Sequence, residues 1–75
     1  MPKLRRVSGG EAVRAQERCG FVQARQRGSH IVHRKRTPKG DIGCVVPLHK
    51  ELAIGALRGI LRQARIAPED FMDKL

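Results

Sequence analysis

The sequence predicts a small α+β sandwich in which helices cover one face of a three-stranded antiparallel sheet. Three observations predict this fold class. Apolar residues recur at helical spacing over residues 9–19 and again over residues 53–64. The chain between these segments consists of short runs with strand character, separated by clusters of turn-forming residues. A length of 75 residues is enough for one domain only, so we expect residues 1–75 to form a single domain.

The first helix is predicted over residues 9–19. Ser8 and Glu11 have the S-x-x-E spacing of a capping box, in which each side chain binds the backbone N–H of the other residue. Gly20 suits the left-handed residue that ends a helix. Two glycines in the first turn weaken this helix, and the sequence offers no reason for them. The apolar stripe of the helix consists of Ala12, Ala15 and Cys19.

Three strands joined by short connections are expected to form an antiparallel meander. They are predicted at Phe21–Gln26, His30–Lys35 and Ile42–Val46. In the first strand, Val22 and Ala24 alternate with Gln23 and Arg25. Gly28–Ser29 forms the first turn, and the turn formers of residues 37–41 close the second hairpin.

A second helix is predicted over residues 53–64, followed by a short last helix that has Pro68 in its first turn. Gly55 and Gly59 fall on other faces of the second helix than its apolar stripe, where they allow another backbone to approach closely. The element order is therefore α-β-β-β-α with a small C-terminal helix. The apolar stripe of the second helix consists of Ala53, Leu57, Ile60, Leu61 and Ala64.

The charge of the chain is strongly basic and unevenly distributed. Sixteen Lys and Arg residues against seven Asp and Glu residues give a formal net charge of +9, and residues 1–40 carry all of this excess. Such a balance predicts a polyanionic partner. No apolar run is long enough to span a membrane, and no hydrophobic region follows the basic first residues, so neither a membrane segment nor a signal peptide is expected.

The basic segment from Arg25 to Lys39 contains no acidic residue, and its charges lie on two strands and their turns. A solvated basic face is one interpretation, and phosphate binding is the favoured one. We expect the partner to be RNA recognised by its shape, because stacking on bases needs aromatic side chains and the chain has only Phe21 and Phe71. The cations of the segment are Arg25, Arg27, Arg34, Lys35, Arg36 and Lys39.

The two cysteines and three histidines do not have the spacing of a metal site. Cys19 and Cys44 are expected to be small buried residues in a protein of the reducing cytoplasm. His30 and His33 lie three apart on one strand and therefore on opposite faces, but the apolar residues do not indicate which face is the core. A site built from His49, Cys44 and one strand histidine is disfavoured. We expect no metal and no other cofactor.

His30 is the strongest candidate for a catalytic group. It follows Gly28–Ser29, where an uncrowded backbone lets a ligand approach, and Arg27 and Arg34 flank it. A neutral imidazole beside cations that hold a phosphate can act as a general base toward a ribose 2′-hydroxyl. The chain has no paired carboxylates, no Ser-based catalytic arrangement and no Gly-rich nucleotide motif.

Several segments resemble the HicA family of toxins, which are mRNA interferases of type II toxin–antitoxin systems. The resemblance covers residues 3–72 and includes Ser8-Gly9 before the first helix. It is strongest in three segments: Arg27-Gly28-Ser29-His30, Val46-Pro47-Leu48-His49, and the second-helix segment Gly55 to Ala64. The sequence departs from the family where His33 replaces an apolar or aromatic residue, where Ala56 replaces Thr, and where Arg65 replaces Gly.

The resemblance implies a fold like that of double-stranded-RNA-binding domains, metal-independent RNA cleavage with His30 as the catalytic residue, and a HicB-type antitoxin as partner. We expect His30 to take the proton of the 2′-hydroxyl, which leaves a 2′,3′-cyclic phosphate. The general acid stays open among His33, His49, a lysine and water. The RNA-binding residues are expected to be Arg25, Arg27, Gly28, Ser29, Arg34 and Lys35.

Two other interpretations remain from the residues themselves. One is a non-catalytic module that binds double-stranded RNA, which burial of His30 in the sheet would favour. The other is a small DNA-binding protein, which is disfavoured because no helix is expected to carry a clustered basic face.

Overall fold

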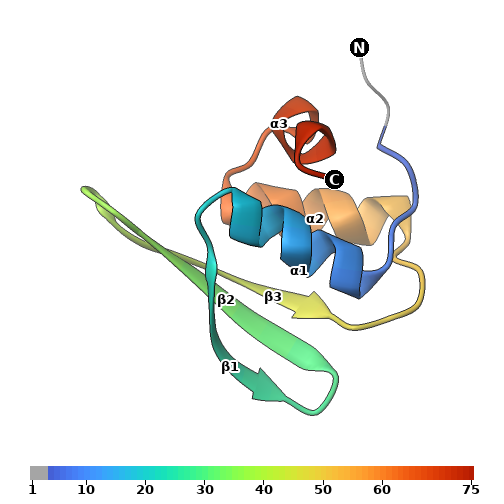
Figure 1. The fold of residues 1–75 in the computed structure, drawn as a ribbon, viewed down its shortest axis with the longest axis horizontal. Helices are drawn as coiled ribbons and strands as arrows, with labels where there is room; N and C mark the ends of the chain where they lie inside the picture. Colours follow the sequence, from blue (N-terminus) through green and yellow to red (C-terminus); the bar gives the residue numbers. More distant parts are fainter. Residues whose placement is uncertain (1–3) are drawn as a thin grey trace.

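A computed structural model describes residues 4–75, and it confirms the predicted α+β class with an open three-stranded antiparallel sheet. The helices α1 and α2 both pack against the third strand, and α3 packs against the two helices on the side away from the sheet (Figure 1). Within the described residues, no helix is both long enough and apolar enough to cross a membrane. The elements are α1 (Gly9–Arg18), β1 (Val22–Arg27), β2 (His30–Thr37), β3 (Gly40–Pro47), α2 (Ile54–Ala64) and α3 (Pro68–Asp73).

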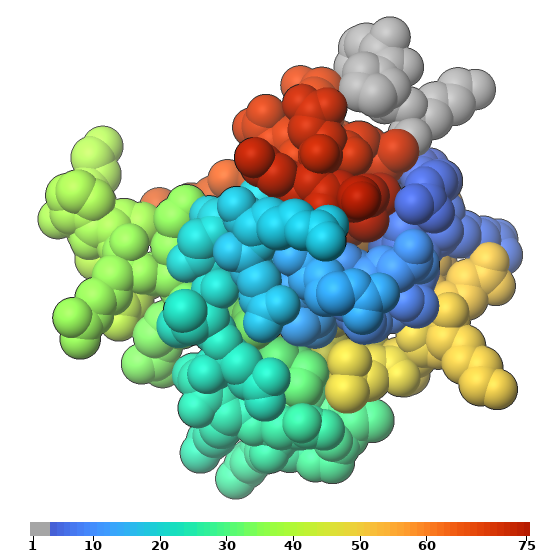
Figure 2. All heavy atoms as spheres, viewed as in Figure 1, coloured from blue at the N-terminus to red at the C-terminus, as the bar shows by residue number. Residues whose placement is uncertain are grey.

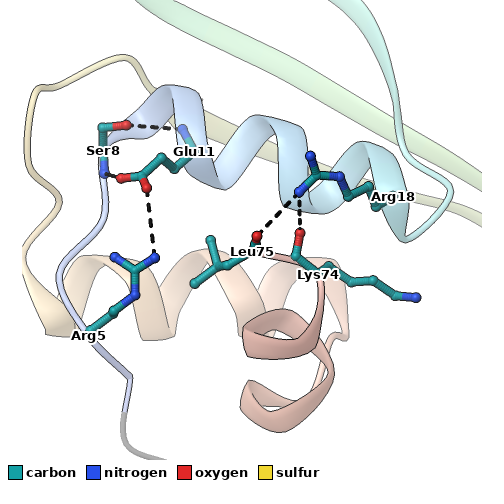
Figure 3. Close-up of polar contacts among 6 residues, drawn as sticks. All are labelled: Arg5, Ser8, Glu11, Arg18, Lys74 and Leu75. Carbon is teal, nitrogen blue, oxygen red and sulfur yellow. Dashed lines mark hydrogen bonds and ion pairs between the residues drawn. The ribbon is translucent and has the colours of Figure 1, made fainter.

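Helix α1 begins at the predicted capping box. The Ser8 side chain accepts a hydrogen bond from the Glu11 backbone N–H at 3.0 Å, and the Glu11 carboxylate accepts one from the Ser8 N–H at 2.9 Å (Figure 3). The backbone hydrogen bond from Ser8 lowers the pKa of Glu11. The helix ends one residue earlier than predicted, at Arg18, and Gly20 adopts the expected left-handed conformation with φ +99°.

The sheet has the order β1-β2-β3, and both neighbouring pairs are antiparallel. The second and third strands extend beyond their predicted ends, so that residues 38 and 39 alone form the turn between them. The first strand starts at Val22 and continues to Arg27, one residue later than predicted at each end, and its register shifts between Gln23 and Arg25.

The alternation of Val22 and Ala24 along β1 does not lead to burial of either face of this strand. Every residue of β1 is exposed, and Val22 keeps 64% of its surface accessible. The helices pack over β3, so β1 forms the outer strand of a hairpin that extends beyond the helical layer (Figure 2). Alternation along a strand predicts that its two faces differ, but burial also requires an element that covers one of them.

The core lies between the helices and the covered face of β2 and β3. The α2 stripe from Leu57 to Ala64 is buried as predicted, whereas Ala53 is the exposed N-cap of that helix. Phe71 of α3 is fully buried and completes the core on the far side of α1 and α2. The buried apolar side chains include Val7, Ala12, Ala15, Phe21, Ile31, Cys44, Val46, Leu52, Leu57, Ile60, Leu61 and Phe71.

The other face of the sheet is uncovered, and we call it the open face. Side chains alternate along a strand, and cross-strand partners share a face. Because Ile31 and His33 of β2 are buried under the helices, His30 and the residues at even spacing from it lie on the open face. The residues of the open face are Val22, Arg25 and Arg27 of β1, His30, Val32, Arg34 and Arg36 of β2, and Asp41, Gly43, Val45 and Pro47 of β3.

Candidate nucleic-acid interface and catalytic histidine

His30 begins β2 directly after the tight Gly28–Ser29 turn. Gly28 has φ +55°, a conformation that glycine adopts without strain, and its carbonyl accepts a hydrogen bond of 2.9 Å from the Gln26 side chain. The Ser29 carbonyl accepts a hydrogen bond of 2.6 Å from the Leu48 N–H. The backbone on the N-terminal side of His30 is thus held by both neighbouring strands, while the His30 side chain is exposed.

The segment that follows β3 ties this end of the sheet to helix α1. The Gly9 N–H donates a hydrogen bond of 2.8 Å to the His49 carbonyl. A Cβ atom at Gly9 would lie 2.1 Å from the Pro47 carbonyl oxygen, a distance at which backbone atoms collide. The close approach of α1 to the end of β3 therefore explains Gly9, for which the sequence offered no reason.

Three arginines share the open face with His30. Arg27 is its cross-strand partner in β1, and Pro47 is its partner in β3. Arg25 lies opposite Val32, one position further along the same face, and Arg34 follows two residues later on β2. The three arginines are exposed, so the structure brings together His30, the Gly28–Ser29 turn and three of the four predicted phosphate-binding cations.

Lys35 does not join this group. It lies on the helix-covered face of β2, where its ammonium group is 5.9 Å from the centre of the Phe21 ring and its stem contacts the position of Gly20. This geometry is that of a cation–π contact at the rim of the core. The sequence could not separate Lys35 from its neighbours, because the covered face of β2 was not known.

His33 is fully buried beneath the helices. Its Nδ1 atom is 2.7 Å from the Gln16 side-chain oxygen, which also accepts a hydrogen bond from the Cys44 thiol at 3.3 Å. Its ring stacks on Phe21, with ring centroids 6.1 Å apart. Burial lowers the pKa of His33. Burial also raises the pKa of the Cys44 thiol, and the hydrogen bond to Gln16 opposes this rise more weakly. His33 has no access to a ligand on the open face, which removes it from the candidates for a general acid.

His49 has a different position. It is exposed, and it lies two residues after Pro47, the cross-strand partner of His30. The Leu48–Ser29 hydrogen bond continues the pairing of β2 and β3 past Pro47, so the chain brings His49 to the end of the sheet that carries His30. Among residues 4–75, no group of three His, Cys, Asp or Glu side chains has the geometry to hold a metal ion.

Helix α2 carries a basic surface that the sequence reasoning missed. Arg58, Arg62 and Arg65 lie four and three residues apart, which at 100° per residue places them on one side of the helix axis, and all three are exposed. The expectation that no helix carries a clustered basic face is therefore wrong. The same spacing rule that found the apolar stripe of α2 could have found this second stripe.

The fold and the open face define a class of protein: a small basic α+β sandwich whose uncovered sheet presents a histidine among arginines. The comparison with protein families agrees with this class. Residues 9–66 match the family model described as "HicA toxin of bacterial toxin-antitoxin", and the chain belongs to this family. It is thus a toxin of a toxin–antitoxin pair, with an antitoxin as partner, in a family known for RNase toxins. No curated protein matches the sequence.

Proposed function

We propose that the protein is a metal-independent endoribonuclease, an mRNA interferase that cleaves mRNA in the cytoplasm and is neutralised by a HicB-type antitoxin. One observation carries the proposal. An exposed histidine stands at the end of an uncovered sheet face with arginines as its neighbours on that face. Membership of the HicA toxin family supports the same function.

In this proposal the arginines of the open face bind the RNA backbone around the cleaved bond. Arg27 is the cation nearest to His30 by register, and Arg25 and Arg34 extend the contact along the strand. Guanidinium groups suit this role because their fork geometry matches two phosphate oxygens. The Gly28–Ser29 turn admits the backbone of the RNA, because Gly28 has open space where a side chain would stand.

His30 then acts as the general base. A ring nitrogen of neutral His30 takes the proton of the 2′-hydroxyl, the 2′-oxygen bonds to phosphorus, and the bond from phosphorus to the 5′-oxygen breaks. The products are a 2′,3′-cyclic phosphate and a 5′-hydroxyl. The nearby guanidinium groups stabilise the negative charge that develops on the phosphorane oxygens.

For the proton that the leaving 5′-oxygen needs, we propose His49. The pairing of His30 with Pro47 and the two-residue step to His49 give a Cα separation of roughly 8–10 Å between the two histidines. Two imidazoles at this separation can reach opposite sides of one phosphate. The burial of His33 leaves His49 as the second exposed histidine of the chain.

The first test compares wild type with His30→Ala on a long single-stranded RNA in EDTA. We expect wild type to cut and His30→Ala to lose at least about 100-fold in rate while it still binds RNA in a shift assay. Arg14→Gln, an exposed change on α1, is the control for surface charge. A product with a 5′-phosphate, or equal cutting by His30→Ala, would refute the mechanism. Binding without cutting by wild type would favour a non-catalytic RNA-binding module.

The second test separates base from acid. A substrate with sulfur in place of the 5′-oxygen has a leaving group that needs no proton. This substrate should restore cutting by His49→Ala but not by His30→Ala. Restoration of neither variant would remove His49 from the acid role.

A further inference from the structure

Arg58, Arg62 and Arg65 form a surface that we call the α2 basic face. Helix α2 contains no acidic residue, and its buried Ile60 lies on the side of the helix axis opposite these arginines. Along the axis, Arg58 and Arg62 are about 6 Å apart and Arg58 and Arg65 about 10 Å apart. The face is therefore a short row of three exposed cations.

The structure of the protein itself does not use these arginines. Among residues 4–75, the ion pairs are Arg5–Glu11 and Arg6–Glu51, and neither involves α2. Arg65 also occupies the left-handed C-cap of the helix with φ 57°, a position that glycine fills with less strain. Arg65 thus places a cation at a site where the local backbone favours glycine.

The surface beside the arginines is bare. Gly55 and Gly59 flank the row, and no heavy atom lies within 4 Å of the place where a Cβ would stand on either residue. Within residues 4–75, no other element approaches these two glycines. Nothing shields this side of the arginines from a large ligand.

One loop links the end of the sheet that carries His30 to the beginning of α2. The loop of residues 48–53 leads from β3 beside His30 to the first turn of α2, and it carries the exposed Lys50 (Figure 1). Along the chain, Arg58 is therefore the nearest of the three arginines to this loop, and Arg65 is the farthest.

The chemistry of this face favours phosphates over a protein partner. Protein interfaces are built around a desolvated apolar or aromatic centre. The large exposed apolar residues of the described chain, Val22, Val45 and Leu48, all lie on the sheet or directly after it, and none lies on α2. A row of unpaired guanidinium groups with no apolar centre suits a sugar–phosphate backbone.

We propose that the α2 basic face is a second RNA-binding surface, which holds the phosphates of the substrate strand that flank the cleaved bond. This inference rests on the proposed function, because it extends the path of the same RNA. It predicts that long RNA gains affinity that a short oligonucleotide centred on the cleaved bond does not.

The test uses two double variants in the His30→Ala background, in which binding is measured without cleavage. Arg58→Gln/Arg62→Gln removes two cations of the α2 basic face, and Arg14→Gln/Lys74→Gln removes two exposed cations elsewhere. Both lower the formal net charge from +9 to +7. We expect the α2 pair to weaken binding of a long RNA at least 10-fold at 0.1 M salt and to lower the slope of log K against log salt by about 1.4. The control pair should change affinity less than 3-fold.

Three further measurements decide the interpretation. Arg58→Lys/Arg62→Lys should restore most of the affinity. In the active protein, the α2 pair should raise KM for long RNA and leave kcat/KM for a short substrate unchanged. An equal loss for both double variants, or an equal loss on short and long RNA, would overturn the inference. So would a loss of antitoxin affinity without a loss of RNA affinity.

The failure of the proposed function is distinguishable from the failure of this inference. If wild type does not cut RNA but the α2 pair selectively loses long RNA, the surface stands and the nuclease does not. If wild type cuts as proposed and the α2 pair binds long RNA like the control pair, the inference fails alone.

Discussion

The buried His33 makes the fold sensitive to acid in a specific pH range. The His33 Nδ1–H donates a hydrogen bond to the Gln16 side-chain oxygen, and the Nε2 atom is buried with no hydrogen-bond partner among the described residues. Protonation would place a charged N–H without a partner in the core. Burial therefore lowers the pKa of His33 below its ordinary value of 6.5, and the negative charge of Glu17 opposes this shift more weakly. The unfolded chain therefore binds more protons than the folded chain below pH 6.5. The contribution of His33 to the free energy of unfolding is therefore fully present above pH 6.5 and is lost progressively as the pH decreases.

The magnitude follows from proton linkage. While His33 stays neutral in the fold, the free energy of unfolding falls by up to about 1.4 kcal/mol per pH unit below pH 6.5. Integrated from pH 7.0 to 5.5, the loss is at most about 1.3 kcal/mol. Glu11, whose folded pKa is lowered from 4.5, contributes stability that is lost only below that pH, so the two effects occur in separate ranges.

Urea unfolding at pH 7.0 and 5.5, followed by far-UV circular dichroism because the chain has no Trp or Tyr, measures this loss. His33→Phe keeps an aromatic ring against Phe21 and should show almost no difference between the two pH values. A variant that lacks both His30 and His49 should keep the full difference, because these histidines are exposed. An unchanged loss in His33→Phe, or no loss in wild type, would refute the reasoning.

Three further predictions concern the fold. Gly9→Ala should lower the free energy of unfolding by at least about 2 kcal/mol, because the new Cβ collides with the Pro47 carbonyl. Gly10→Ala should be tolerated, because its Cβ would meet only side-chain atoms at 3.7 and 3.8 Å. Urea unfolding of both variants measures the difference, and equal stability would contradict the prediction. Arg65→Gly should stabilise the protein by about 1 kcal/mol by relief of the left-handed cap, and a lower melting temperature would count against it. Phe71→Ala should cost about 3–5 kcal/mol, since its side chain is fully buried between α3 and the other helices. A loss below 1 kcal/mol would show that α3 is dispensable.

The sequence predicted the elements well because their signals are local. The capping box at Ser8, the period of the α2 stripe and the turn at Gly28–Ser29 each depend on residues within one or two turns of chain, and all three are present in the structure. The odd spacing of His30 and His33 likewise predicted that the two histidines lie on opposite faces. The predicted ends of the strands were less accurate, because a strand continues for as long as it pairs with a neighbouring strand, and that pairing is not visible in the local sequence.

The candidate site was predicted only in part. The sequence placed His30 next to Arg27 and the Gly28–Ser29 turn, because these residues are adjacent in the chain. The resemblance to the HicA family added the expectation that His30 is the catalytic residue. The chain alone did not show that Lys35 lies under the helices or that His49 returns to the end of the sheet at His30, since both depend on strand pairing and helix placement.

The sequence by itself therefore determined the order of elements, the basic character and the two possible faces of β2. Only the tertiary structure decided which face the helices cover, because apolar residues stand on both sides of His30 and His33 in sequence. That one decision buries His33 beside Gln16 and leaves His30 accessible. The physical reason is that alternation fixes the relative orientation of neighbouring side chains, while burial depends on contacts between elements far apart in the chain.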